Sequence, residues 1–319
     1  MPLAGSPSLF FYLPVERPSI DFRHQGYAAT RRATLVGAIA VVLWATLATL
    51  TAASGRVPPF QLVATSFAIG GGVGIAVIVR SGRGFAAWRQ PWPVWTLGIA
   101  GLFGYHFAYF TALRNAPPVE AGLIAYLWPL LIVLFSALLP GERLRWHHVA
   151  GALAGFGGAA LIVTGGERVG FRTEFAFGYT MAFAGAFTWA GYSVLSRRFG
   201  NVPTDVVAGF CVASAVLAGV AHLVLETTVM PGSASEWLAI VGLGLGPVGA
   251  AFYVWDHGVK RGDIQALGAL SYLAPLLSTL LLVMVGLASA DAVIGIACVL
   301  ITAGAVLASK DMFRRRGKD

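Results

Sequence analysis

The residues best suited to bind a solute are one histidine and two tyrosines in a single apolar stretch. Tyr105 and Tyr109 are four residues apart, and His106 and Tyr109 are three apart, so all three share one face of an α-helix. Facing lipid, each polar group would lose its hydrogen bonds at a cost of about 1–3 kcal/mol. We therefore expect this face to point into the protein, where it either lines a solute path or bonds neighbouring helices.

Further aromatic residues lie away from the ends of the apolar stretches. Trp44 and Trp189 are near mid-stretch, although tryptophan usually prefers the membrane interface, and either helix packing or a cavity wall explains them. Tyr126 and Trp128 are two residues apart, so at most one lines a central path unless a kink redirects it. Rings would contact the apolar part of a solute, and phenols and imidazole would hold its polar groups. The expected substrate-binding residues are Trp44, Tyr105, His106, Tyr109, Tyr126, Trp128, Trp189, Tyr192 and Tyr272.

Pro129 and Pro275 lie in the middle of two apolar stretches. A proline lacks the backbone N–H and frees the carbonyl four residues earlier, which kinks a helix. We expect these two residues to act as hinges of helices that move or line the cavity. A static kink is the alternative.

Other chemistry is not indicated. The sequence shows no metal-ligand spacing, no phosphate-binding loop and no nucleophile with a nearby base, so we predict no catalytic residue, metal or cofactor. Cys211 and Cys298 lie in apolar stretches and are expected to be structural thiols. Asp256 and Lys260 are expected to form an ion pair at a helix end. The remaining acidic residues near predicted helix starts are expected to cap them: Glu120, Asp205, Glu236, Asp263 and Asp291.

Composition places these residues in a membrane protein. Of 319 residues, 57% are hydrophobic and 11% are charged, whereas a soluble domain carries about a quarter charged residues. The net charge of +8 does not indicate a nucleic-acid partner, because the basic residues occupy short loops between apolar stretches. The expected partners are a lipid bilayer and a small-molecule substrate.

Ten apolar stretches of about twenty residues have the length of membrane spans. Backbone groups find no hydrogen bonds in lipid, so each span is predicted to be an α-helix. Residues 1–30 contain prolines and mixed charge and are expected to form a flexible extension. The predicted spans are 34–53, 60–79, 93–113, 119–139, 147–164, 176–196, 204–224, 236–256, 263–285 and 290–308.

The basic residues predict the orientation of these spans. With a cytoplasmic N-terminus, 18 of the 22 Lys and Arg residues fall on the cytoplasmic side. The other four are Arg56, Arg114, Arg168 and Arg172. Cytoplasmic loops of membrane proteins carry an excess of Lys and Arg. We therefore expect both termini to be cytoplasmic and the protein to lie in the inner membrane.

The sequence also repeats itself. Trp44 matches Trp189 at an offset of 145 residues, and the motif YLWP at 126–129 matches YLAP at 272–275 at an offset of 146. Arg114 matches Lys260 at the same offset. Each unit would hold five spans, so the second unit would enter the membrane from the opposite side. The predicted fold is therefore an all-α membrane protein with ten transmembrane helices in two inverted five-helix repeats.

These residues resemble a known family. The stretches GAIAVVLWATLATL, GLIAYLWPLLIVLFSALLPGERL and GALAGFGGAALIV are similar to the drug/metabolite transporter superfamily, EamA type. YLWP and the matching SYLAP at 271–275 look most like the YddG branch of aromatic amino acid exporters. One departure is Gly141-Glu142-Arg143, which the second repeat replaces with Leu287-Ala288-Ser289. The resemblance places the repeats at 31–165 and 175–310, followed by a basic cytoplasmic tail at 311–319.

The resemblance implies a secondary transporter that exports amino acids, aromatic and other neutral amphipathic metabolites, by alternating access through the aromatic-lined cavity. An enzyme is not expected. Three other functions remain open on the sequence, and one of them, a structural or channel-like protein, would need no two-fold repeat with kinks. A sugar-nucleotide or related metabolite carrier of the same superfamily would need Lys or Arg inside its spans, and a membrane-embedded enzyme would need a clustered catalytic set at membrane depth.

Overall fold

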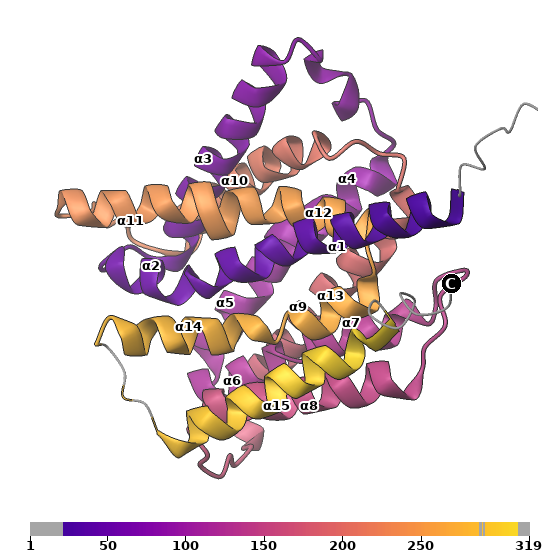
Figure 1. Ribbon diagram of the computed structural model, residues 1–319. Coiled ribbons are helices and arrows are strands. Elements are labelled where there is room, and N and C mark those ends of the chain that lie inside the picture. Colours follow the sequence, from indigo (N-terminus) through magenta and orange to yellow (C-terminus); the bar gives the residue numbers. More distant parts are fainter. Residues whose placement is uncertain (1–21, 287–288, 290, 312–319) are drawn as a thin grey trace, which may run out of the picture.

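The computed structural model describes residues 22–286, 289 and 291–311, and every regular element among them is a helix. The helices pack side by side in one bundle (Figure 1). In the first half they are α1 (Phe22–Ala45), α2 (Leu47–Ala53), α3 (Pro59–Arg80), η1 (Gly84–Trp88), α4 (Trp92–Ile99), η2 (Ala100–Gly104), α5 (Tyr105–Asn115), α6 (Pro118–Ala125), α7 (Trp128–Ser136) and α8 (Trp146–Thr164).

The second half begins after the short helix η3 (Thr173–Phe175). Its helices are α9 (Ala176–Leu195), η4 (Ser196–Phe199), α10 (Val206–Leu225), α11 (Ala234–Leu245), η5 (Gly246–Ala250), α12 (Ala251–Arg261), α13 (Ile264–Leu270), α14 (Leu273–Met284) and α15 (Ala292–Ala308). Among the described residues, seven helical segments are long and apolar enough to cross a membrane, and Ala292–Ala308 is a shorter apolar helix. The all-helical membrane class predicted from composition is confirmed at this level.

Element boundaries recur between the halves at an offset of 146 residues. The π-helices η2 and η5 cover 100–104 and 246–250, and the helices that follow them, α5 and α12, cover 105–115 and 251–261. Two predicted spans are also broken at matching places, between α6 and α7 and between α13 and α14. A π-helical turn inside an α-helix is rare and often occurs at a functional site. The structural agreement extends the sequence repeat to the irregular features of each half.

The N-terminal prediction needs a correction at its boundary. Helix α1 begins at Phe22, within the stretch 1–30 that was expected to be a flexible extension. Residues 1–21 and most of the predicted tail, 312–319, lie outside the described residues.

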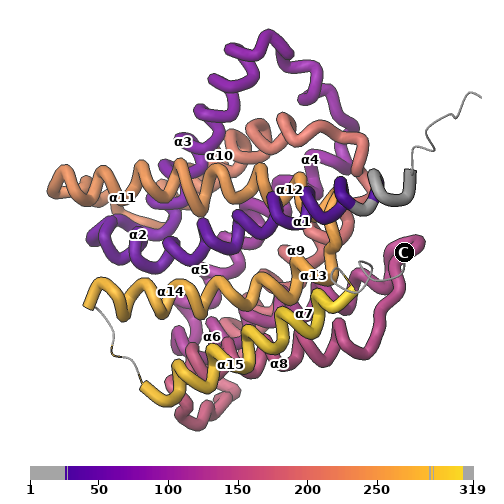
Figure 2. The backbone as a smooth tube through the Cα atoms, in the orientation of Figure 1, coloured from indigo at the N-terminus to yellow at the C-terminus, as the bar shows by residue number. Residues whose placement is uncertain are grey.

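Close helix contacts depend on glycine. A Cβ atom at Gly151 of α8 would lie 2.5 Å from the Gly304 carbonyl oxygen of α15, and a Cβ at Gly258 of α12 would lie 2.5 Å from Gly37 Cα of α1. Small residues let helix backbones approach closely in a membrane, where packing replaces the hydrophobic effect as the main source of association. The tube in Figure 2 shows α1 beside α12, and α8 beside α15.

The bundle has two chemically distinct ends. At one, Arg83 pairs with Asp205, Arg197 with Glu142, and the start of α1 lies near the end of α12, where the Asp263 amide donates to Thr34. We call this the basic end, because most Lys and Arg residues of the described loops lie there. At the other, Arg114 pairs with Glu226 beside the start of α3. We call this the open end, because the cavity described next reaches it.

Candidate substrate site

A cavity of about 590 Å³ lies between the two halves of the bundle. Its volume is within the range typical of small-molecule sites. Its wall extends to Thr51 and Val57, which flank the connection from α2 to α3 at the open end. Seven of the nine residues predicted from the sequence line it: Trp44, Tyr105, His106, Tyr109, Tyr126, Trp128 and Trp189.

The break between α6 and α7 explains why both Tyr126 and Trp128 reach the cavity. A regular helix would turn them to different faces. Here α6 ends at Ala125 and α7 begins at Trp128. Tyr126 therefore caps the end of α6, Trp128 starts α7, and the spacing of a single helix does not apply to them. Pro129 is consequently the second residue of α7, where its missing N–H removes no helical hydrogen bond. The prediction of Pro129 and Pro275 as moving hinges stays a prediction.

Tyr272 does not line the cavity, contrary to the sequence-based prediction. Its side chain is fully buried beside α8, with its ring against Gly155. The hydroxyl accepts a hydrogen bond from the Leu130 amide (3.1 Å) and donates one to the Tyr126 carbonyl (3.2 Å). It thereby satisfies backbone groups that the break between α6 and α7 leaves without partners.

Tyr192 is also absent from the cavity wall, which corrects a second prediction. It is 2% exposed and packs over the backbone of η2, where a Cβ at Gly101 would lie 2.3 Å from its ring. Tyr192 sits behind Trp189, whose ring centroid is 5.3 Å away. Its spacing of three residues from Trp189 indicated a shared face, but the close approach of η2 draws the ring between helices.

His106 presents one free nitrogen to the cavity. Its Nδ1 lies 2.7 Å from the Leu102 carbonyl oxygen, which can only accept a hydrogen bond. In the neutral ring Nδ1 therefore carries the hydrogen, and Nε2 is left as an acceptor. Beside it, the Tyr105 and Tyr109 rings stack with centroids 5.9 Å apart and an interplanar angle of 5°. This arrangement gives a flat aromatic surface next to a hydrogen-bond acceptor.

The cavity wall carries no formal charge among the described residues: no Asp, Glu, Lys or Arg lines it. Its other polar side chains include Thr51, Ser66 and Ser278. The Ser66 hydroxyl is buried and has no hydrogen-bond partner. A buried hydroxyl without a partner is costly, so a solute that reaches Ser66 would satisfy an unpaired group. Neither Ser66 nor its position could be singled out from the sequence.

Four tryptophans close the cavity toward the basic end. The Trp44 ring lies 5.9 Å from Trp128, 5.7 Å from Trp189 and 5.0 Å from Trp255, measured between centroids. Trp255 is fully buried and donates a 3.0 Å hydrogen bond from its indole N–H to the Ser193 hydroxyl. We call these four rings the tryptophan floor. Trp255 was not among the residues predicted from the sequence, although it lies 146 residues after Tyr109 and the repeat relates the two positions.

Beyond the floor lies a buried ion pair. The Lys260 ammonium is 2.8 Å from Asp256 Oδ1, and their side chains are 3% and 1% exposed. Thr204 donates to Asp256 Oδ2 (2.8 Å), and Lys260 also donates to the Val202 carbonyl (3.1 Å). The predicted pairing is confirmed, but the pair is enclosed by protein rather than placed at an exposed helix end, because the segment 202–204 covers it.

The open end holds an anchor that the sequence did not reveal. Glu226 accepts hydrogen bonds from the Phe60 and Gln61 amides at the start of α3, and it pairs with Arg114. His222 Nδ1 lies 2.9 Å from its second oxygen. A carboxylate at a helix N-terminus is favoured by the unpaired N–H groups there. Glu226 lies 166 residues from Phe60, so no local pattern connects them.

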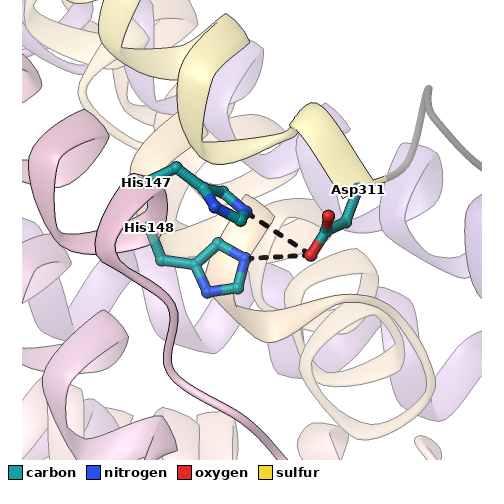
Figure 3. A group of neighbouring side chains, drawn as sticks. All are labelled: His147, His148 and Asp311. Carbon is teal, nitrogen blue, oxygen red and sulfur yellow. Dashed lines mark ion pairs between the residues drawn. The ribbon is translucent and has the colours of Figure 1, made fainter.

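A cluster of possible metal ligands lies at the basic end, away from the cavity. His147, His148 and Asp311 place one ligand atom each within 4.8 Å of one another (Figure 3). Arg145 donates to both Asp311 oxygens at 3.1 Å, and its amide donates to His148 Nδ1. The negative charge of Asp311 is thus already neutralised by the Arg145 guanidinium. We interpret the cluster as a set of contacts that joins the start of α8 to the segment after α15. Sequence analysis predicted no metal site and did not foresee this grouping.

The sequence profile of the EamA-like transporter family matches residues 31–164 and again residues 176–310. The chain belongs to this family. An aromatic amino acid exporter YddG from Ancylobacter novellus is 58% identical over 280 residues, which cover 87% of this chain and 96% of the relative. The aromatic amino acid exporter YddG from Escherichia coli is 27% identical over 263 residues, covering 79% and 87% of the two chains.

A crystal structure of a protein 57% identical in sequence has the same fold, with a TM-score of 0.84 over 89% of this chain and 99% of the other. The two matches to the EamA-like family profile coincide with the two sets of helices whose boundaries recur at 146 residues. The cavity is lined from both sets: α1, α5 and α6 belong to the first, while α9 and α14 belong to the second. The cavity thus lies at the junction of the two segments that match the family profile.

Proposed function

We propose that this transporter exports amino acids, aromatic and other neutral ones, through the cavity at the junction of its halves. The observation that carries the proposal is the uncharged aromatic wall around about 590 Å³ of space. A zwitterionic amino acid has an apolar or aromatic side chain that rings can contact, and a polar end that phenols, hydroxyls and imidazole can bind. The relatives named as aromatic amino acid exporters support this substrate class.

The proposed mechanism is alternating access by two inverted five-helix repeats. Ten spans require each predicted span to cross the bilayer, including those that are broken by η2, by η5 or by the turns before Pro129 and Pro275. The recurring boundaries and the matched breaks support this arrangement. In it, the cavity that is now open at one end would close there and open at the other, with the helix breaks taking up the movement.

The basic end is proposed to face the cytoplasm of a cell whose inner membrane holds the protein. The 18-to-4 distribution of Lys and Arg supports this orientation. A reporter that is active only in the periplasm, fused after Asp319, should be silent. An active reporter would reverse the orientation and, with it, the direction of export.

The transport proposal is tested with sealed membrane vesicles. Everted vesicles that hold the protein should accumulate radiolabelled phenylalanine, tryptophan and leucine faster than vesicles from cells without it. UDP-glucose in the same panel tests the sugar-nucleotide alternative, and recovery of unchanged solute tests the enzyme alternative. Uptake of UDP-glucose without uptake of any amino acid would refute the proposed substrate class.

A further inference from the structure

The buried pair Asp256–Lys260 has no role in the open cavity. Removing two charges from water is unfavourable, and apolar residues often replace such a pair without loss of stability. Ionisable residues inside a membrane bundle therefore indicate function more often than structural need. Here both charges are fully bonded, since Thr204 donates to the carboxylate and the ammonium donates to the Val202 carbonyl.

Asp256 and Lys260 lie in α12 between Trp255 and the helix end at the basic end of the bundle. Trp255 of the tryptophan floor directly precedes Asp256 in α12. A cavity of about 10 Å³, with room for about one water molecule, is lined by Asp256, Lys260 and Tyr192 beneath the floor. The Tyr192 hydroxyl is buried. Two charges and one buried hydroxyl thus line a small gap next to the residue that follows Trp255.

The repeat relates this gap to the open cavity. Phe110 and Tyr109 line the open cavity, and the residues 146 positions later are Asp256 and Trp255. If the two halves exchange conformations, residues equivalent to the present wall become the wall of a cavity at the basic end. Asp256 gives that second wall a charge, with its partner Lys260 one helical turn further along α12, whereas the present wall is neutral.

We propose that Asp256 and Lys260 form the loading site for the α-ammonium and α-carboxylate groups of an amino acid at the basic end, an inference that rests on the proposed function. The carboxylate of the substrate binds Lys260, and its ammonium group binds Asp256. A zwitterion replaces both partners at once, so neither buried charge is left unpaired. A solute with only one of these groups leaves one charge without a partner, which selects for amino acids at loading.

The two walls then differ in their affinity for the charged end of the substrate. At the basic end, a zwitterion meets two charges in an enclosed site, where electrostatic interactions are strong. At the open end, the same zwitterion meets neutral phenols, hydroxyls and imidazole. The substrate is therefore selected by charge where it loads and held by weaker neutral contacts where it leaves.

The test compares the two faces of the full-length protein in native membrane vesicles. Exchange of radiolabelled phenylalanine is measured in everted vesicles, which load at the basic end, and in right-side-out vesicles, which load at the open end. The double variant Asp256→Asn/Lys260→Gln removes both charges together and leaves no buried charge unpaired. The control Arg172→Gln/Glu174→Gln removes an ion pair whose side chains are each 60% exposed.

We expect the double variant to raise the KM for phenylalanine about tenfold in everted vesicles and to change it less than about threefold in right-side-out vesicles. Wild-type exchange in everted vesicles should be inhibited by tryptophan far better than by phenethylamine or 3-phenylpropanoate, and the double variant should lose this preference. If the pair had a purely structural role, the double variant would change the KM for phenylalanine equally at both faces. It would also keep the preference for tryptophan over the two inhibitors that carry only one charged group.

An unchanged KM at the basic end, or an equal rise at both faces, would overturn the loading site while leaving the proposed function intact. Absence of amino-acid exchange by the wild-type protein would instead refute the proposed function. The size-exclusion profile of each purified variant in detergent establishes that it is folded. Should the double variant fail to fold, Asp256→Glu provides the second measurement, since lengthening the carboxylate should raise the KM at the basic end alone.

Discussion

The two ends of the proposed pathway differ in the chemistry that surrounds the solute. Toward the open end the wall is neutral and aromatic, and the ionic anchor Glu226 stands beside the path, holding the start of α3. Toward the basic end, four tryptophan rings close the path and a buried ion pair follows them. The two ends therefore use charge differently: at the open end Glu226 of the second half holds a helix end of the first half, and at the basic end a pair within the second half is enclosed.

Equivalent positions of the two halves have diverged in their ionic partners. Arg114 and Lys260 occupy equivalent positions, yet Arg114 pairs with a carboxylate 112 residues away and Lys260 with one a single helical turn before it. The equivalent of Asp256 in the first half is Phe110, an apolar residue of the cavity wall. A single exchange of phenylalanine for aspartate thus separates a neutral wall from a charged one.

The largest effect is expected from leaving one buried charge unpaired. Lys260→Met should destabilise the protein by about 3–5 kcal/mol, because Asp256 would remain in the bundle without its cation. Lys260→Met combined with Asp256→Leu should recover most of that loss. Thermal unfolding in detergent, followed by tryptophan fluorescence, measures both. Equal stability of the single and double variants would show that the pair is less enclosed than its contacts imply.

A somewhat smaller effect is expected on transport when the neutral wall is truncated. Trp189→Ala and His106→Ala should each lower phenylalanine exchange by about ten- to a hundredfold, since they remove ring contact and the Nε2 acceptor respectively. Both proteins should stay monodisperse. The control Val299→Ala changes a side chain on α15 that is 68% exposed, and it should exchange normally. Normal exchange by both wall variants would assign those residues to packing alone.

Removing the unpartnered hydroxyl should have a milder effect. Ser66→Ala deletes one neutral hydrogen bond to the solute, which corresponds to about 1 kcal/mol or a roughly fivefold rise in KM. Stability should not fall, since the hydroxyl has no partner within the protein. Ser214→Ala is the matched control, because its hydroxyl is likewise buried without a partner but lies outside the cavity wall. A Ser66 variant with unaltered KM would show that the solute does not reach this hydroxyl.

The smallest effect is expected at the partly exposed pair of the basic end. Glu142→Gln removes the partner of Arg197, but both side chains are about a quarter exposed, and such pairs contribute roughly 0–1 kcal/mol. Arg197 also keeps its hydrogen bonds to the Val259 and Gly262 carbonyls. The unfolding midpoint should fall by no more than a few degrees. A fall comparable to that of Lys260→Met would mean that enclosure does not distinguish the two pairs.

Sequence patterns predicted the membrane class and most of the cavity because the relevant signals are local. Apolar length identifies a helix in lipid, and polar or aromatic residues within such a helix must face inward. Trp44, His106 and Trp189 follow from this rule. Its failures have structural causes: Tyr272 lies where a helix break needs a hydroxyl, and Tyr192 lies where a π-helical turn brings the neighbouring backbone close.

Contacts between distant residues could not be predicted from one sequence. In the sequence, Glu226 is one acidic residue at the end of an apolar stretch. Its role appears only in the folded protein, where the start of α3 lies beside it. Asp256 and Lys260 have the spacing of an exposed surface pair, and only the covering segment 202–204 makes them a buried one. Trp255 is the exception among the missed residues. The offset that related the two halves would have located it opposite Tyr109.

The spacing of Asp256 and Lys260 also has an electrical consequence. One elementary charge moved across a membrane at 100 mV gains or loses about 2.3 kcal/mol. These two opposite charges lie on adjacent turns of one helix and are 2.8 Å apart. A movement of α12 across the membrane field would therefore carry both charges together and transfer no net charge. A bound zwitterion adds no net charge to that pair. The free energy of moving this part of the protein is therefore independent of the membrane potential, with or without bound substrate.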